Sequence, residues 1–291
     1  MGSRRANDKG TTRSAPGTAL RAYACGTLDP AHASLGEADL HEGVHQARKA
    51  IRRTRAVLAM GNGLLGPGAG LIDRELRALN TGLSSLRDAH ALVEVIDRLL
   101  RRERSDDMRA VFQRAREAAI AVRTRVGEGA TRSDPGLATR RAMLVVLRAA
   151  LAALDWSRPT PAGLRMAVAD SDLRSHQARR RACERDADES RQDEAWHRWR
   201  RRARRAAHQR RALETIGLPV PAASEHFDRR TTHRLGEAQD LSLLLDHCHR
   251  DSPFSKADRQ ALRERARPAL QRARRRIARG AAERRDACPA D

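Results

Sequence analysis

The sequence is poor in aromatic residues, with three Phe, three Trp and one Tyr among 291 positions. A core must therefore be built from Ala, Leu and Val, which suit helices and exclude an all-β fold. Long hydrophobic runs are missing too. The longest, from Ala142 to Leu147, is far shorter than the ~20 residues that a membrane span needs. We therefore predict an all-α protein of about ten helices, with no membrane partner.

Cysteine is scarce as well, and its four positions are too scattered to suggest a disulfide framework: Cys25, Cys183, Cys248 and Cys288. Residues 1–20 are polar and lack the apolar segment of a secretory signal. We therefore expect a cytoplasmic protein. Residues 1–15 are expected to form a disordered basic tail.

Acidic residues are few relative to basic ones, since 37 Asp and Glu stand against 58 Lys and Arg, for a formal net charge of +21. Only Lys9, Lys49 and Lys256 among these cations are lysines. Such a chain attracts polyanions, namely DNA, RNA, acidic membrane surfaces or free polyphosphate. The planar guanidinium group matches phosphate oxygens. A GC-rich genome would explain Arg in place of Lys, but it would not explain the excess of cations over anions.

Glycine, proline and aspartate divide the chain into helical segments. From Pro16 onward the apolar residues recur at helical spacing. We expect helix breaks at residues 29–30, 61–70, 127–136, 158–163, 217–221 and 252–253, and a helix start at Ser105.

The chain contains an internal repeat whose offset is the 152 residues that separate His45 from His197. The same offset pairs Arg48 with Arg200, Arg52 with Arg204, Arg53 with Arg205, Leu83 with Leu235, Asp88 with Asp240 and Leu92 with Leu244. His, Leu and Asp are rare enough here that their shared register indicates duplication. We predict two homologous helical halves, residues 16–155 and 160–291.

Each repeated helix presents a cationic face beside an apolar one. On a helical wheel an arc of about 120° holds His45, Arg48, Lys49, Arg52 and Arg55. The second copy gathers His197, Arg200, Arg201, Arg204, His208 and Arg211, with Trp196, Trp199 and Ala203 on its apolar side. A solvated face normally mixes acids with its arginines, and these stretches contain none. The pattern favours a polyanion site over a merely solvated face.

Two histidines and two aspartates recur with these arginines. His45 and His197 begin the two stripes, where each would add charge beside a phosphate, or alternatively serve as a core histidine with satisfied hydrogen bonds. Asp88 and Asp240 are expected to orient an arginine or to cap a helix, as structural support for the cationic rows.

These segments resemble the CHAD domain, the conserved histidine α-helical domain, over essentially the whole chain. Its signature, V-H-x-x-R-x-x-x-R-R-x-R followed by an L-G-x-x-R-D-type segment, is matched at residues 44–55 and 83–88, with Ser84 in place of the usual Gly. The second copy keeps its His and Arg positions but has Ala207 and His208 where Arg and Tyr are usual. Residues 235–240 match the second L-G segment.

The resemblance implies a pseudo-twofold pair of four-helix bundles around one basic central cavity. It also implies binding of inorganic polyphosphate and association with polyphosphate granules, without catalysis, cofactor or metal. The E-x-E-x-K signature of a fused CYTH triphosphatase domain is not found, so we expect a stand-alone module. The residues expected to bind polyphosphate are His45, Arg48, Lys49, Arg52, Arg53, Arg55, His197, Arg200, Arg201, Arg204, Arg205 and His208.

Other chemistries fit less well. Residues 41–45 match the zincin pattern H-E-x-x-H, but Gly43 interrupts the helix and arginines surround the site. His247-Cys248-His249 has side chains of the metal-binding type, but on a helix the side chains of such close neighbours would point apart. The sequence shows no nucleotide-binding or kinase motif.

The alternative function is non-specific binding of a nucleic-acid backbone. The sequence supports it less well, because it lacks the aromatic platforms on which bases would stack.

Overall fold

The protein is described by a computed structural model over residues 15–61, 63–184, 189–221, 229–249 and 251–286. Within these residues it contains ten α-helices, one 3-10 helix at Pro135–Leu137 and no strand, so the predicted all-α fold is confirmed. None of the helices searched is both long and apolar enough to cross a membrane. The helices are α1 (Pro16–Ser34), α2 (Leu40–Met60), α3 (Gly68–Gly82), α4 (Ser84–Arg102), α5 (Asp106–Ser133), α6 (Ala138–Ala152), α7 (Pro161–Ala182), α8 (Glu189–Thr215), α9 (Arg229–Asp246) and α10 (Lys256–Asp286).

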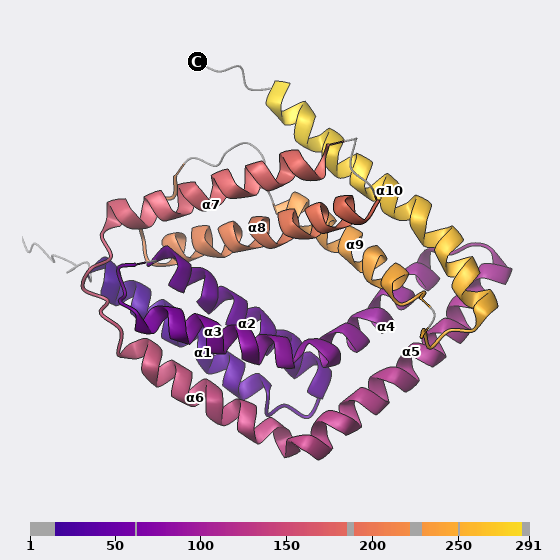
Figure 1. Ribbon diagram of the computed structural model, residues 1–291, viewed down its shortest axis with the longest axis horizontal. Helices are drawn as coiled ribbons and strands as arrows, with labels where there is room; N and C mark the ends of the chain where they lie inside the picture. Colours follow the sequence, from indigo (N-terminus) through magenta and orange to yellow (C-terminus); the bar gives the residue numbers. More distant parts are fainter. Residues whose placement is uncertain (1–14, 62, 185–188, 222–228, 250, 287–291) are drawn as a thin grey trace, which may run out of the picture.

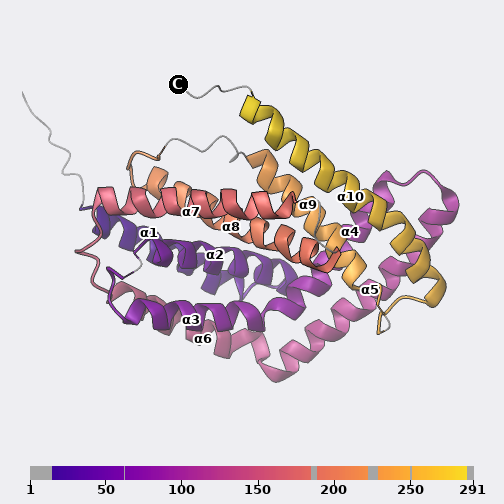
Figure 2. The ribbon, with the colours of Figure 1, turned by 45° about the horizontal axis from the view of Figure 1, so that its top comes forward.

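Helices that are neighbours in sequence pack as pairs: α1 with α2, α4 with α5, α7 with α8 and α9 with α10. Figures 1 and 2 show α7 and α8 beside the group of α1, α2, α3 and α6, while α4, α5, α9 and α10 form the opposite end. Between the two halves of the sequence, α2 packs on α8 and α4 packs on α9. These contacts bring together the four helices that carry the repeated segments.

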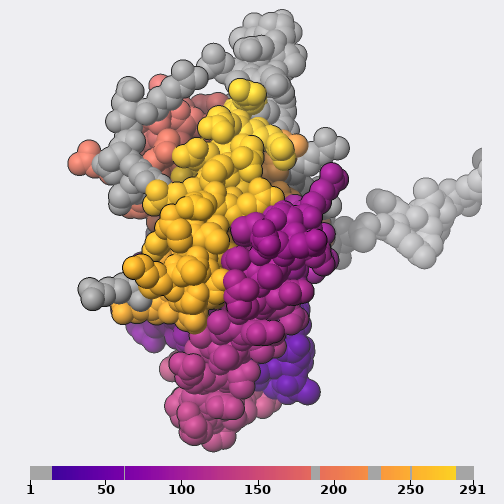
Figure 3. Space-filling model, turned by 90° about the vertical axis from the view of Figure 1, so that its right-hand side faces the viewer, coloured from indigo at the N-terminus to yellow at the C-terminus, as the bar shows by residue number. Residues whose placement is uncertain are grey.

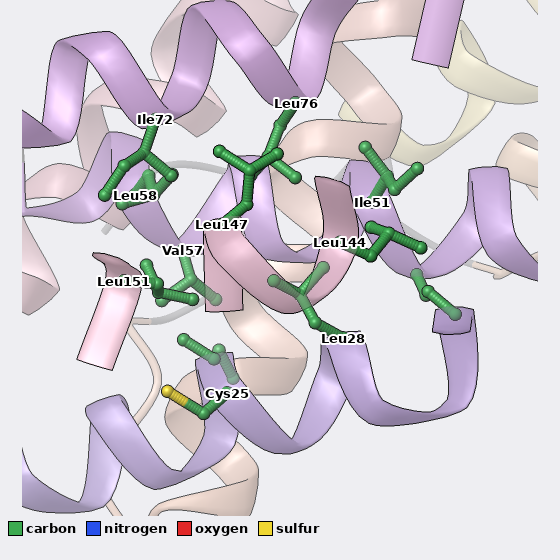
Figure 4. Close-up of a cluster of buried hydrophobic side chains, with 14 of the residues drawn as sticks. Cys25, Leu28, Ile51, Val57, Leu58, Ile72, Leu76, Leu144, Leu147 and Leu151 are labelled. Atoms are coloured by element: carbon green, nitrogen blue, oxygen red, sulfur yellow. The ribbon is translucent and has the colours of Figure 1, made fainter. Parts of the chain in front are cut away.

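The core is aliphatic, as the scarcity of aromatic residues requires. In the largest cluster, side chains of α1, α2, α3 and α6 interdigitate, among them Leu28, Ile51, Leu76 and Leu147 (Figure 4). The same cluster extends into the second half of the sequence through α7 and α8, where Leu213 is fully buried. Burial of each such side chain stabilises the fold by about 1.5–3 kcal/mol before entropy is counted.

A second cluster joins α4 and α5 to α9 and α10, around Phe112, Leu244 and Leu262. Figure 3 shows α10 against α5 on this face of the molecule. The hydrophobic clusters thus connect helices from both predicted halves. The boundary at residues 155–160 between two homologous halves rests on the repeat in the sequence, and it stays a prediction.

The helix break predicted at residues 29–30 is wrong. Pro30 lies inside α1, which continues to Ser34 because Leu28 and Ala31 are buried in the core. This burial outweighs the backbone hydrogen bond that proline removes near the end of the helix. The break predicted over residues 127–136 is confirmed at its end only, since α5 runs through Gly127 and the chain turns at residues 134–137. The predicted tail lies outside the described residues, Ala15 excepted.

Candidate functional site

Helix α2 is held in one orientation by its first turns. Asp39 caps it by accepting hydrogen bonds from two backbone N–H groups of the first turn, at 3.0 and 3.1 Å. At Gly43 the helix approaches α1 so closely that a Cβ atom would lie 2.0 Å from the carbonyl oxygen of Ser34. Val44 and Ile51 are then fully buried. The cationic face of α2 is thereby directed away from this core.

The cationic faces of α2 and α8 meet in a cavity of about 570 Å³, with α4 and α9 closing its sides. We call it the central cavity. Eight arginines line it against three aspartates. The sequence-predicted residues that it brings together are His45, Arg48, Arg52, Arg55, His197, Arg200, Arg201, Arg204, Arg205, His208, Asp88 and Asp240.

Two predicted residues do not line this cavity. Lys49 and Arg53 lie on the other side of the contact between α2 and α8, where they line a separate groove. The helical wheel placed them within or beside the same arc as Arg52. Because α8 packs against that arc, it divides the cationic residues of α2 between two spaces.

Some arginines of the central cavity are held by neighbouring groups. Arg48 donates to the backbone carbonyl of Asn80 and, at 2.9 Å, to the hydroxyl of Ser84. Arg55 makes a two-pronged ion pair with Asp73, with N···O distances of 2.8 and 3.1 Å. These bonds fix the direction of the α2 row before any ligand arrives.

Five other arginines form neither an ion pair nor a hydrogen bond within the described part of the chain: Arg52, Arg200, Arg201, Arg204 and Arg205. Burial and the charges of neighbouring arginines lower the pKa of Arg52 to about 9 and that of Arg204 to about 10. Burial also lowers the pKa of Arg200. Positive charge that exceeds the nearby negative charge is an arrangement that a polyanion stabilises.

The three histidines of the cavity are neutral at ordinary pH, since burial lowers the pKa of His45, His197 and His208, the last to about 3. The Nδ1–H of His197 donates to Oε1 of Gln239 at 2.7 Å, which leaves its Nε2 free to accept. The Nε2 atom of His208 is buried and has no hydrogen-bond partner.

The aspartates differ in their roles. Asp240 accepts a hydrogen bond from Arg98 of α4 at 2.8 Å, and its charge opposes the lowering of the pKa of Arg200. Asp88 lies within α4 and caps no helix; its charge opposes the lowering of the pKa of Arg48. A third aspartate, Asp246, lines the cavity, and burial raises the pKa of its carboxyl group.

The prediction from sequence omitted several residues that line the cavity. Arg87 belongs to the L-G-x-x-R-D-type segment at residues 83–88, which therefore signalled it, and it forms an ion pair with Glu94 at 2.6 Å. Gln239 occupies the equivalent position in the second copy. Asn80 comes from α3 and carries no signal in the sequence, because only tertiary packing places it there.

The histidines of the H-E-x-x-H pattern lie in different surroundings. His41 stacks on His90, with 5.4 Å between ring centroids, whereas His45 faces the central cavity. In the described ranges no three histidine, cysteine or acidic side chains are grouped as metal ligands.

Together the fold and the site define an all-helical protein built around an arginine-lined cavity. A family model, the CHAD domain, matches residues 27–249. The chain belongs to the CHAD domain family, and the resemblance seen in the sequence is confirmed.

Two solved structures share this fold. PptA from Streptomyces chartreusis has a TM-score of 0.67 at 18% sequence identity, covering 92% of this chain and 99% of that chain. The CHAD domain from the plant Ricinus communis has a TM-score of 0.54 at 18% identity, covering 94% and 88% of the two chains. No curated protein sequence matches this chain.

Proposed function

We propose that this protein binds inorganic polyphosphate in the central cavity. The observation that carries the proposal is the group of arginines there that form neither an ion pair nor a hydrogen bond in the described residues: Arg52, Arg200, Arg201, Arg204 and Arg205. Polyphosphate is a chain of closely spaced anionic oxygens, and guanidinium groups on facing helices would contact it from both sides. The implication that CHAD domains bind polyphosphate agrees with this arrangement.

Polyphosphate fits the cavity better than a nucleic acid does. Binding of single strands without sequence preference normally uses exposed aromatic rings on which bases stack. Here Phe112, Trp156, Trp196 and Trp199 are buried, and Tyr23 lies in the groove that Lys49 and Arg53 line, outside the cavity. A polyanion without bases needs no such platform.

We further propose that the protein acts as a binding module and associates with polyphosphate granules in the cytoplasm. The groups that dominate the cavity are guanidinium ions, which hold and neutralise phosphate but cannot act as general bases at neutral pH. A granule presents the same polymer at high density, so the same contacts would retain the protein there.

A competition experiment tests the proposed ligand. Fluorescent duplex DNA is bound to the protein at low salt, and long-chain polyphosphate or unlabelled DNA is added at equal phosphate concentration. We expect polyphosphate to displace the labelled DNA at a concentration at least tenfold lower than unlabelled DNA requires. Displacement by DNA at an equal or lower concentration would overturn the proposal and favour nucleic acid.

A further inference from the structure

A second cationic space adjoins the central cavity on the far side of the contact between α2 and α8. It has a volume of about 960 Å³ and lies among α1, α2, α8 and the start of α9. We call it the α1 groove. Its basic residues are Lys49 and Arg53 from α2 and Arg210 and Arg211 from α8. The proposed function leaves this groove without a role.

The charges of the α1 groove are largely uncompensated. Glu214 is the one carboxylate among the residues described along its lining. Arg210 is held by Asp172 and by the backbone carbonyl of Pro221. In contrast, Lys49, Arg53 and Arg211 form no ion pair within the described chain. The groove therefore offers cations to an anionic ligand, as the central cavity does.

His208 connects the two spaces, since it lines both of them. Its pKa is lowered chiefly by burial and then by arginines and a lysine of both spaces, including Arg53 of the groove and Arg204 of the cavity. Its Nε2 atom has no hydrogen-bond partner. A buried polar atom without a partner costs stability, which a ligand oxygen that accepts from this nitrogen would offset.

We propose that the α1 groove is a second segment of the polyphosphate site, occupied by the same chain that fills the central cavity and passes His208 between them. This inference rests on the proposed function. Once one part of the chain is bound in the cavity, the next phosphates reach the groove at high effective concentration. Chains long enough to occupy both spaces therefore bind more tightly than chains that fill the cavity alone.

The first test compares tripolyphosphate with long-chain polyphosphate by calorimetry. In the groove variant, Lys49→Gln with Arg53→Gln, the loss of affinity for the long chain should exceed the loss for tripolyphosphate about tenfold. The matched control is Arg74→Gln with Arg77→Gln on α3. It also removes two cations, but these are exposed and line neither the cavity nor the groove. We expect the control to change both affinities alike, by less than about twofold.

A second test uses the wild-type protein and the scarcity of lysine. Lys49 lies in the groove and Lys256 is exposed at the start of α10, so an amine-reactive label quantified by mass spectrometry reports on both. Long-chain polyphosphate should slow the labelling of Lys49 relative to Lys256. Tripolyphosphate, at a concentration that saturates the central cavity, should leave the ratio unchanged.

The outcomes separate the inference from the proposed function. If neither polyphosphate binds, the proposed function itself fails. If the long chain binds but Lys49 stays as reactive as before, the inference about the groove is wrong. Equal losses for the two chain lengths in the groove variant would also overturn it, because Lys49 and Arg53 would then act only through net charge.

Discussion

Arg52 and Arg204 lie in the central cavity, where burial and then the charges of neighbouring arginines lower the pKa of Arg52 to about 9 and that of Arg204 to about 10. Retaining both charged forms costs stability in the free protein. Replacement of both by Gln should therefore raise the melting temperature without ligand, by about 2–4 °C for each ~1 kcal/mol of repulsion removed. The stabilisation that added polyphosphate gives to the wild-type protein should be lost, as a thermal melt would measure.

Charge reversal at the same positions separates a site from a general effect of charge. Arg52→Glu with Arg204→Glu should abolish measurable binding of polyphosphate in calorimetry. Arg101→Glu with Arg102→Glu changes the net charge equally, but at exposed positions of α4 outside the cavity, and should alter the affinity little. Similar losses in the two variants would mean that net charge alone accounts for binding.

The histidines of the cavity predict a dependence on pH. In the free protein the pKa of His45 and that of His197 lie below the ordinary value near 6.5, chiefly through burial. A bound phosphate favours the imidazolium form and raises both pKa values. Binding then takes up protons and tightens as the pH falls from about 7.5 toward the free-protein pKa values.

Calorimetry in buffers of different ionisation enthalpy counts these protons. His45→Gln with His197→Gln should flatten the pH profile while leaving the affinity near pH 8, where the arginines dominate, almost unchanged. The terminal phosphates of the ligand titrate in the same range, and a long chain dilutes their contribution. A variant that keeps the wild-type slope would identify the two histidines as packing residues.

At the scale of helices, Gly43 sets the distance between α1 and α2. A Cβ at this position would lie 2.0 Å from the backbone carbonyl oxygen of Ser34, which cannot rotate away. Gly43→Ala should therefore destabilise the protein by about 1–3 kcal/mol in urea unfolding. In the control Gly129→Ala in α5, the new Cβ meets no atom within 4 Å and should stabilise by up to about 1 kcal/mol.

Much of α2 and α8 could be predicted from sequence, because their charge pattern depends only on helical periodicity. Periodicity does not say where a neighbouring helix will pack. Gln209 of α8 donates to the backbone carbonyl of Ala56 on α2 at 2.9 Å, and the packing of α8 on α2 separates Arg52, which lines the cavity, from Arg53, which lines the groove. The assignment of Arg53 to the groove and of Asn80 to the cavity needed the tertiary structure.

The helix boundaries show the same limit. Ser105 begins α5 as predicted, since its hydroxyl accepts from the N–H of Met108 at 3.5 Å, a purely local contact. Pro30 does not end α1, because the burial of Leu28 and Ala31 against distant parts of the chain outweighs the local preference. Local signals were sufficient where no long-range packing opposed them.

For the whole molecule, whose net charge is +21, added salt should stabilise the free protein but weaken its binding of polyphosphate. In the free protein, added salt screens the repulsion among arginines and should raise the melting temperature. Binding of polyphosphate releases condensed counterions, so its affinity should fall linearly on a log–log plot as salt rises. The melting temperatures with and without polyphosphate should therefore converge as salt increases.

The slope of that plot also reports how many phosphates the cavity contacts. By analogy with single-stranded nucleic acid, each contact contributes a slope of about −0.7, so Arg52→Gln with Arg204→Gln should reduce its magnitude by about 1.4. The neutral pair Arg101→Gln with Arg102→Gln serves as the control and should leave the slope nearly unchanged, because these side chains lie outside the cavity. An affinity independent of salt, or melting curves that stay parallel across the salt series, would contradict an electrostatic site.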